Sequence, residues 1–411
     1  MTSSDLRHIR EIVQTHMDRG EISGGIVLAS CDGEIKYLEA QGQSAVEPKV
    51  ALRPDTVFWV ASMTKPIVAA SILMLMEEGA VRLDDGVEKY IPEFAKPRLV
   101  RVLKPGSPPI PAFGGFVPPD PNAPAPQYDH EPAQRPLTVR DFMTFTSGLQ
   151  TIGVQNDAIP PITSEDTVGS WVAKLGDVPL EHQPGTRWHY SNTVGSEVLV
   201  RIAEVASGRP YAELLQDRLF TPLGMKTASF GVRADLRARS LPLGDALEAA
   251  IGPLLTARFT SGSAGLRMTI EDYWRFAQML LNEGELDGRR YLSAASVREM
   301  SRNQIGDLPF LGVRCLEYAG RDNIGNPGLG YGYGVAVVTD AARSGMFLPS
   351  GGYGWDGIGT RRVWIMPSLK TVLIMLMPDY LNVADPAHEE IERYVTATVP
   401  RLRAGQAIVS D

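Results

Sequence analysis

Apolar runs of strand length lie near both ends of the chain, and helical patterns fill the middle. The runs at 24–30 and 35–40 flank an Asp-Gly pair, which predicts a β-hairpin. Three more strands are predicted at 331–338, 361–366 and 371–377. Amphipathic spacing, caps and apolar runs predict helices over 6–17, from Ser62 through 76, from Thr138, and over 193–206, 211–220, 273–282 and 386–399.

Strands at both ends with helices between them favour one sheet that both chain ends build. The predicted fold class is therefore α/β of the α+β type, with an antiparallel sheet, terminal helices beside it and an inserted helical domain. We predict an α/β domain from residues 1–60 and 261–411, and a mostly helical domain over 61–260.

A proline-rich segment interrupts the helical domain. Eleven prolines lie over 105–136, so we predict a long loop without a helix or a central strand. The segment is either a surface excursion or one wall of a pocket built with Phe113, Phe116 and Tyr128, because long loops in compact domains are often functional.

Composition excludes several classes of protein. The 411 residues are 44% hydrophobic and carry a formal net charge of -8, so the chain can bury a large core and is not expected to bind nucleic acid. The N-terminus lacks the apolar core of a signal peptide, and the longest apolar stretch, 66–76, is too short to span a bilayer. We predict a soluble, cytoplasmic protein whose oligomeric state stays open.

Cysteines and histidines give no local metal motif. Cys31 and Cys315 form no CxxC pair and are predicted to be free thiols. None of the six histidines has paired metal-ligand spacing, so we predict no metal and no cofactor.

Ser62 and Lys65 are the central candidates for chemistry, at a strand-to-helix junction. Residues three apart are neighbours on a helix, so the hydroxyl and the amine would lie together. Desolvation in a buried helix would lower the pKa of Lys65, and free N–H groups at the helix start favour negative charge near Ser62. A lone Ser-x-x-Lys match is otherwise an ordinary helix start, so further motifs are required.

Tyr190-Ser191-Asn192 supplies a second motif, just before the helix predicted at 193. A phenol near a lysine ammonium loses its proton more easily and can then accept the Ser62 proton. Tyr380-Leu381-Asn382 is a rival match, which we interpret as structural because it follows the last strand.

A glycine-rich strand supplies the third motif. Trp355-Asp356-Gly357-Ile358 precedes the strand at 361, and glycine there lets a substrate approach the backbone. The Ile358 N–H, paired with that of Ser62, is a candidate oxyanion hole.

In this order, Ser62-x-x-Lys65, Tyr190-x-Asn192 and Trp355-x-Gly357 resemble the serine β-lactamase and penicillin-binding-protein superfamily in its class C branch, and most of all the family VIII carboxylesterases. The resemblance runs roughly from the first helix to the last. It implies a β-lactamase/transpeptidase-like fold, Ser62 as nucleophile and Lys65 with Tyr190 as the proton-handling pair. It also implies that Asn192, Trp355 and Gly357 bind substrate.

The third motif departs from the β-lactamase pattern. β-Lactamases carry Lys-Thr-Gly, whose lysine helps to hold a β-lactam carboxylate, and a neutral indole stands here. Asp356 would repel an anionic substrate further if its side chain faces the pocket. We therefore expect cleavage of short-chain carboxylic esters through a Ser62 acyl-enzyme.

Several alternatives to an esterase stay open at this point. A β-lactamase or D-aminopeptidase-like amide hydrolase and an acyltransferase would use the same acyl-enzyme. A non-catalytic protein that binds an acyl ligand is less consistent with Ser62, Lys65 and Tyr190 all being present. An α/β-hydrolase is excluded, because the chain has no Gly-x-Ser-x-Gly elbow.

Overall fold

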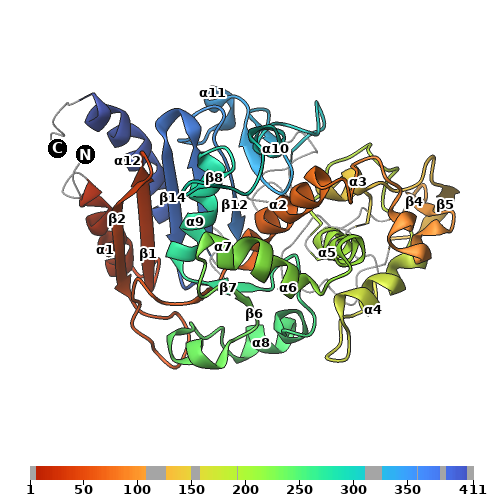
Figure 1. Cartoon of the computed structure of the whole chain (residues 1–411), viewed down its shortest axis with the longest axis horizontal. Coiled ribbons are helices and arrows are strands. Elements are labelled where there is room, and N and C mark those ends of the chain that lie inside the picture. Colours follow the sequence, from red (N-terminus) through yellow and green to blue (C-terminus); the bar gives the residue numbers. More distant parts are fainter. Residues whose placement is uncertain are drawn as a thin grey trace.

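The computed structural model describes residues 6–107, 126–149, 158–191, 193–310, 326–358, 360–379 and 386–404. Its largest sheet has seven strands, and all neighbouring strands run antiparallel (Figure 1). The order β10-β11-β12-β13-β14-β1-β2 places strands from the start of the chain beside strands from its end. The strands are β1 (Gly24–Cys31), β2 (Glu34–Gly42), β10 (Leu329–Tyr331), β11 (Ala336–Val338), β12 (Tyr353–Gly357), β13 (Arg361–Met366) and β14 (Thr371–Leu376).

Helices cover both faces of this sheet. Helix α1 (His8–Asp18) packs against α12 (Pro386–Arg403) on one face, and α9 (Ile270–Leu281) packs on β13, β14 and β1 on the other (Figure 1). The predicted fold class, an antiparallel sheet flanked by terminal helices, is confirmed. The division into domains at residues 60 and 261 stays a prediction.

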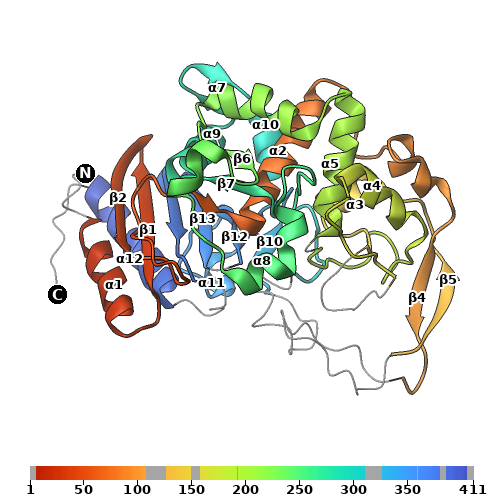
Figure 2. The same cartoon turned by 90° about the horizontal axis from the view of Figure 1, so that it is seen from below.

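The remaining helices lie mostly on one side of the sheet, as Figure 2 shows from below. They are α2 (Thr64–Glu77), α3 (Val139–Met143), α4 (Val168–Ala173), α5 (Val194–Ser207), α6 (Tyr211–Leu215), α7 (Thr221–Leu223), α8 (Asp245–Ile251), α10 (Ala294–Met300) and α11 (Ala341–Ser344). Within the described residues, no helix combines the length and the apolar character needed to cross a membrane.

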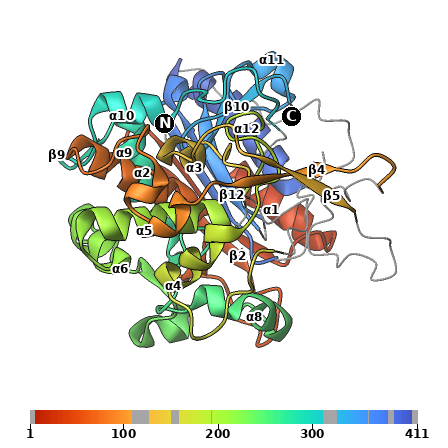
Figure 3. The same ribbon diagram turned by 90° about the vertical axis from the view of Figure 1, so that its right-hand side faces the viewer.

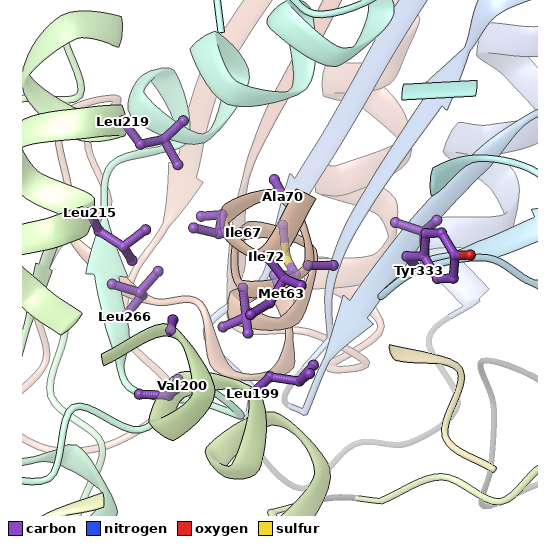
Figure 4. Packing of buried hydrophobic residues seen from close by; sticks show 14 of the residues in the cluster. Met63, Ile67, Ala70, Ile72, Leu199, Val200, Leu215, Leu219, Leu266 and Tyr333 are labelled. Atoms are coloured by element: carbon purple, nitrogen blue, oxygen red, sulfur yellow. The ribbon is translucent and has the colours of Figure 1, made fainter. Parts of the chain in front are cut away.

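Helix α2 runs through the middle of the hydrophobic core. It is apolar all round, and nearly every side chain from Thr64 to Leu75 is buried. Figure 4 shows Ile67 and Ile72 surrounded by side chains of other elements, among them Leu199 and Leu215. Each large apolar side chain buried in this way contributes about 1.5–3 kcal/mol to folding. The hydrophobic core around α2 therefore holds the start of this helix in a fixed position.

The strand predicted over 331–338 is wrong as one element. The structure has two antiparallel strands there, β10 and β11, with a turn between them in which the Gly332 N–H donates to the Val335 carbonyl at 2.8 Å. Gly334 has φ of 72°, and a Cβ on it would lie 2.8 Å from the Ala69 Cβ of α2. The glycines permit this tight turn against α2, which the apolar pattern alone does not show.

The loop predicted over 105–136 is also corrected in part. Strand β5 (Tyr128–Pro132) lies inside that range and pairs with β4 (Leu99–Leu103), and the pair extends along one end of the molecule (Figures 2 and 3). The strand is tolerated because its proline stands at the strand end, on a two-stranded sheet without a central position. Residues 108–125, including Phe113 and Phe116, lie outside the described residues, and Tyr128 stacks on Arg101.

Two more small sheets complete the described strands. One has the order β3-β7-β6 and the other pairs β8 with β9. Their bounds are β3 (Phe58–Trp59), β6 (Ser229–Phe230), β7 (Leu266–Met268), β8 (Glu285–Leu286) and β9 (Arg289–Arg290).

Candidate active site

Ser62 lies in a short turn between β3 and α2. The turn, Ala61–Met63, is a 3-10 segment, so the α-helix starts at Thr64 and not at Ser62 as predicted. Ala61 adopts a left-handed φ of 49°, which costs about 1–2 kcal/mol for a residue with a Cβ. The Thr64 hydroxyl donates to the Ala61 carbonyl at 2.7 Å and stabilises this turn. Ser62 is 9% exposed, at the border of the core.

Lys65 and Tyr190 both contact the Ser62 hydroxyl. The Lys65 ammonium donates to Ser62 Oγ at 3.1 Å, and the Tyr190 phenol donates to the same oxygen at 2.7 Å. Lys65 Nζ also lies 5.0 Å from the centre of the Tyr190 ring. The structure therefore brings together a hydroxyl, an amine and a phenol whose positions in the sequence are up to 128 residues apart.

Lys65 is buried and held from two sides. It is 2% exposed, and its Nζ donates to the backbone carbonyl of Ser263 at 2.9 Å as well as to Ser62. These two hydrogen bonds hold Nζ in a defined position relative to Ser62.

Aromatic rings fix the position of Tyr190. Its ring lies 5.6 Å from that of Phe145 and 5.5 Å from that of Trp355, both in tilted or edge arrangements. Trp355 packs in turn on Tyr331 at 5.4 Å. Aromatic pairs in such geometries stabilise one another by about 0.5–1.5 kcal/mol beyond area burial, so the phenol is held towards Ser62.

Gly357 brings strand β12 against the serine turn. A Cβ at this position would lie 2.7 Å from the Val60 carbonyl and 3.4 Å from the Ser62 nitrogen, so only glycine allows this approach. Ile358 follows and packs on the cluster of Trp59, Ala61 and Leu243. The candidate oxyanion-hole residues, Ser62 and Ile358, thus lie on neighbouring segments.

Trp355 and Asp356 point to opposite faces of β12. Trp355 is 1% exposed and contacts Tyr190, so it lies under the site. Side chains alternate along a strand, and Asp356 pairs across the sheet with Arg362, which bonds Glu392 of α12 at 2.8 Å. Asp356 thus belongs to the α12 face, and the expected repulsion of anions by this carboxylate does not apply. The neutral indole of Trp355 is then the one feature of this motif that argues against an anionic substrate.

Two of the predicted positions cannot be placed. Asn192 lies outside the described residues, and so does the rival motif at 380–382. Among the residues that the structure does describe, no group of three His, Cys, Asp or Glu side chains is arranged to hold a metal ion.

The sequence analysis missed the residues behind Lys65. Glu197 of α5 is 0% exposed, and its Oε1 accepts from the hydroxyls of Ser261 at 2.6 Å and of Ser263 at 2.7 Å. Burial raises the pKa of the Glu197 carboxyl, while those hydrogen bonds and the Lys65 charge oppose the rise. Two features of the sequence could have indicated these residues: Glu197 is an acid among apolar neighbours, and 261–265 is a run of small residues.

The chain is similar to known proteins over most of its length. Residues 9–395 match the family model described as Beta-lactamase. Esterase EstB of Burkholderia gladioli is 27% identical over 88% of each chain, and lovastatin esterase of Penicillium rubens is 28% identical over 71% of this chain and 72% of its own. The solved structure of EstCE1, described as a hydrolase with promiscuous acyltransferase activity, superposes with a TM-score of 0.72 at 20% identity, over 96% of this chain and 99% of its own. This chain belongs to the beta-lactamase family.

Proposed function

We propose that this protein is a serine carboxylesterase of the family VIII type, which cleaves short-chain esters through an acyl-enzyme on Ser62. The observation that carries the proposal is the pair of contacts to Ser62 Oγ, at 3.1 Å from Lys65 Nζ and 2.7 Å from the Tyr190 oxygen. A serine hydroxyl becomes nucleophilic only when a neighbouring group takes its proton. Two named esterases among the relatives support an ester as the substrate class.

In the proposed acylation step, Ser62 Oγ attacks the ester carbonyl while its proton moves to the Tyr190 oxygen. The Lys65 ammonium favours the phenolate form of Tyr190 before the attack. The Ser62 and Ile358 N–H groups hold the oxyanion, and Tyr190 returns the proton to the departing alcohol. Water then attacks the acyl-enzyme with the same pair as base, and Ser62 is released as the free hydroxyl.

The residue at position 355 supports a neutral substrate. In the similar motif of β-lactamases, a lysine that contacts a substrate carboxylate stands at this position. Here the buried indole of Trp355 packs on Tyr190 instead. An anionic substrate would lose its counter-charge and would have to be desolvated without compensation. Esters without a carboxylate do not have that cost.

A panel of chromogenic substrates tests this function. p-Nitrophenyl acetate, butyrate and decanoate, butyryl p-nitroanilide and nitrocefin are compared at one enzyme concentration. We expect a burst of p-nitrophenol equal to the enzyme concentration and the highest kcat/KM for the short esters. Higher kcat/KM for nitrocefin or the anilide would assign an amide hydrolase, and faster p-nitrophenol release with added methanol, together with methyl butyrate, would assign acyl transfer.

Tyr190→Phe should lower kcat about 10²–10³-fold with little change in KM, because it removes the proton carrier and keeps the ring contacts to Phe145 and Trp355. Steady-state kinetics with p-nitrophenyl butyrate measure both constants. Tyr331→Phe is the matched control, because it removes a phenol hydroxyl from the same aromatic group and should leave kcat near that of the wild type. Equal losses in both variants would show that Tyr190 acts through packing alone.

A further inference from the structure

A buried acid lies directly behind the proposed catalytic lysine. Glu197 is on α5, which packs against α2, and no part of it is exposed. It is too far from solvent to bind a polar ligand at the surface. Its partners lie in the turn at 261–263, between α5 and Lys65.

Three hydrogen bonds converge on one oxygen of Glu197. Oε1 accepts from the Ser261 hydroxyl at 2.6 Å, from the Ser263 hydroxyl at 2.7 Å and from the Ser263 N–H at 3.2 Å. The carbonyl of the same Ser263 accepts from Lys65 Nζ at 2.9 Å. A continuous chain of contacts therefore leads from Glu197 through Ser263 and Lys65 to Ser62.

The turn between these groups is tightly packed. A Cβ on Gly262 would lie 2.5 Å from the Val200 side chain and 2.7 Å from the Ser196 carbonyl, both on α5. Gly265 closes the turn, since its N–H donates to the Ser261 carbonyl at 2.9 Å. The close packing leaves little room for a second arrangement of the turn while Glu197 binds it.

Glu197 is an energetically unfavourable residue at a fully buried position. Its Oε2 is buried without a hydrogen-bond partner among the described residues, and a buried carboxyl costs more free energy than an apolar side chain of similar volume. Apolar residues at positions 197, 261 and 263 together would fill the same space without any buried polar group that needs a partner. This arrangement is better explained by what it holds in place than by stability.

We propose that Glu197 is a positioning residue for the proposed reaction: by holding Ser263 through its Oε1, it aims the Ser263 carbonyl at Lys65 and thereby keeps Nζ within reach of Ser62. The proposal rests on the proposed function for its effect on rate. Its geometric part, the position of Nζ, does not.

Variants that separate hydrogen bonding from charge test the proposal in the full chain. Glu197→Gln keeps an oxygen acceptor at the same reach, Glu197→Asp keeps the charge with a shorter reach, and Glu197→Leu removes both. We expect the kcat of Glu197→Gln to stay near that of the wild type. We expect the Asp and Leu variants to lose about 10²-fold in kcat with KM nearly unchanged, because a shift of Lys65 Nζ by about 1 Å can lower the rate that much. Glu204→Gln, on the same helix, is the matched control and should match the wild type.

A crystal structure of Glu197→Leu, or of Glu197→Asp if the first does not fold, gives a readout apart from activity. We expect Lys65 Nζ to leave hydrogen-bond distance of the Ser263 carbonyl. Wild-type kcat in the Asp and Leu variants, or a loss in Gln as large as in Leu, would overturn the proposal, as would an unmoved Nζ. If the wild-type protein hydrolyses no ester, the proposed function fails, and the position of Nζ alone decides this inference.

Discussion

Ser62→Ala should abolish the burst and lower kcat for p-nitrophenyl butyrate by about 10⁴-fold or more, because no acyl-enzyme can form. The substitution removes one oxygen at the border of the core and leaves the turn Ala61–Met63 to its backbone bonds. Binding need not change, since Gly357 and the neighbouring N–H groups remain. Stopped-flow release of p-nitrophenol measures the burst, and mass spectrometry of the quenched enzyme detects the added acyl group.

Ser71→Ala is the matched control for this experiment. Ser71 is a buried serine of α2, and its hydroxyl contacts the Val68 carbonyl and the Tyr211 phenol, away from the site. Removing it should keep the burst. A full burst in Ser62→Ala, or an acyl group found on another residue of that variant, would show that the nucleophile lies elsewhere.

The sequence predicts the local half of this site well. Ser62, in the 3-10 turn, and Lys65, in the first turn of α2, are three residues apart, and short-range geometry suffices to place the amine beside the hydroxyl. The Asp-Gly turn likewise indicates the hairpin at 24–40, although the register shift between Ala29 and Ser30 does not follow from the turn. Tyr190 and Gly357 came from the order of motifs in a known family, because no local pattern relates them to Ser62.

The other half depends on contacts between distant segments. Glu197 and Ser263 are 66 residues apart, and each looks unremarkable in its own segment: an acid near a helix start and a small residue in a turn. The acid becomes buried only when α5 packs on α2 and the turn at 261–263 packs on α5. The strand at 331–338 was mispredicted for a related reason, since the close approach of Gly334 to α2 is a tertiary contact. Conformations set by a neighbour are not encoded in a run of apolar residues.

Lys65→Met should lower kcat about 10³–10⁴-fold, because it removes the charge that favours phenolate at Tyr190 and one of the two hydrogen bonds to Ser62. Methionine has nearly the same length and fits a site that is 2% exposed, so the fold should be kept. Steady-state kinetics and circular dichroism of the purified variant measure the two effects separately. A loss of less than tenfold would contradict the proposed role.

The same variant should also change how stability depends on pH. The Lys65 charge holds down the pKa of the Glu197 carboxyl, which burial raises, so its removal raises that pKa further. A carboxyl whose folded pKa lies above its unfolded value, about 4.3, stabilises the fold fully only below the unfolded pKa and loses this contribution as pH rises through the folded pKa. The Tm of Lys65→Met relative to wild type should therefore fall between pH 5 and pH 9.

A double variant isolates the carboxyl as the cause. Lys65→Met with Glu197→Gln has no titrating group at position 197, so a pH dependence of its Tm relative to Glu197→Gln alone arises from Lys65 itself, and the part due to the carboxyl is what the Lys65→Met and wild-type pair shows beyond it. Differential scanning calorimetry of the wild type, the two single variants and the double variant at both pH values gives the eight Tm values needed. A Tm deficit of Lys65→Met that is equal at pH 5 and pH 9 would mean that Lys65 and Glu197 do not share an electrostatic interaction across the Ser263 turn. Because the kinetic and thermal effects arise from one buried amine, each limits the interpretation of the other: a large loss of kcat with a pH-independent Tm would leave Tyr190, and not Glu197, as the group to which the Lys65 charge is coupled.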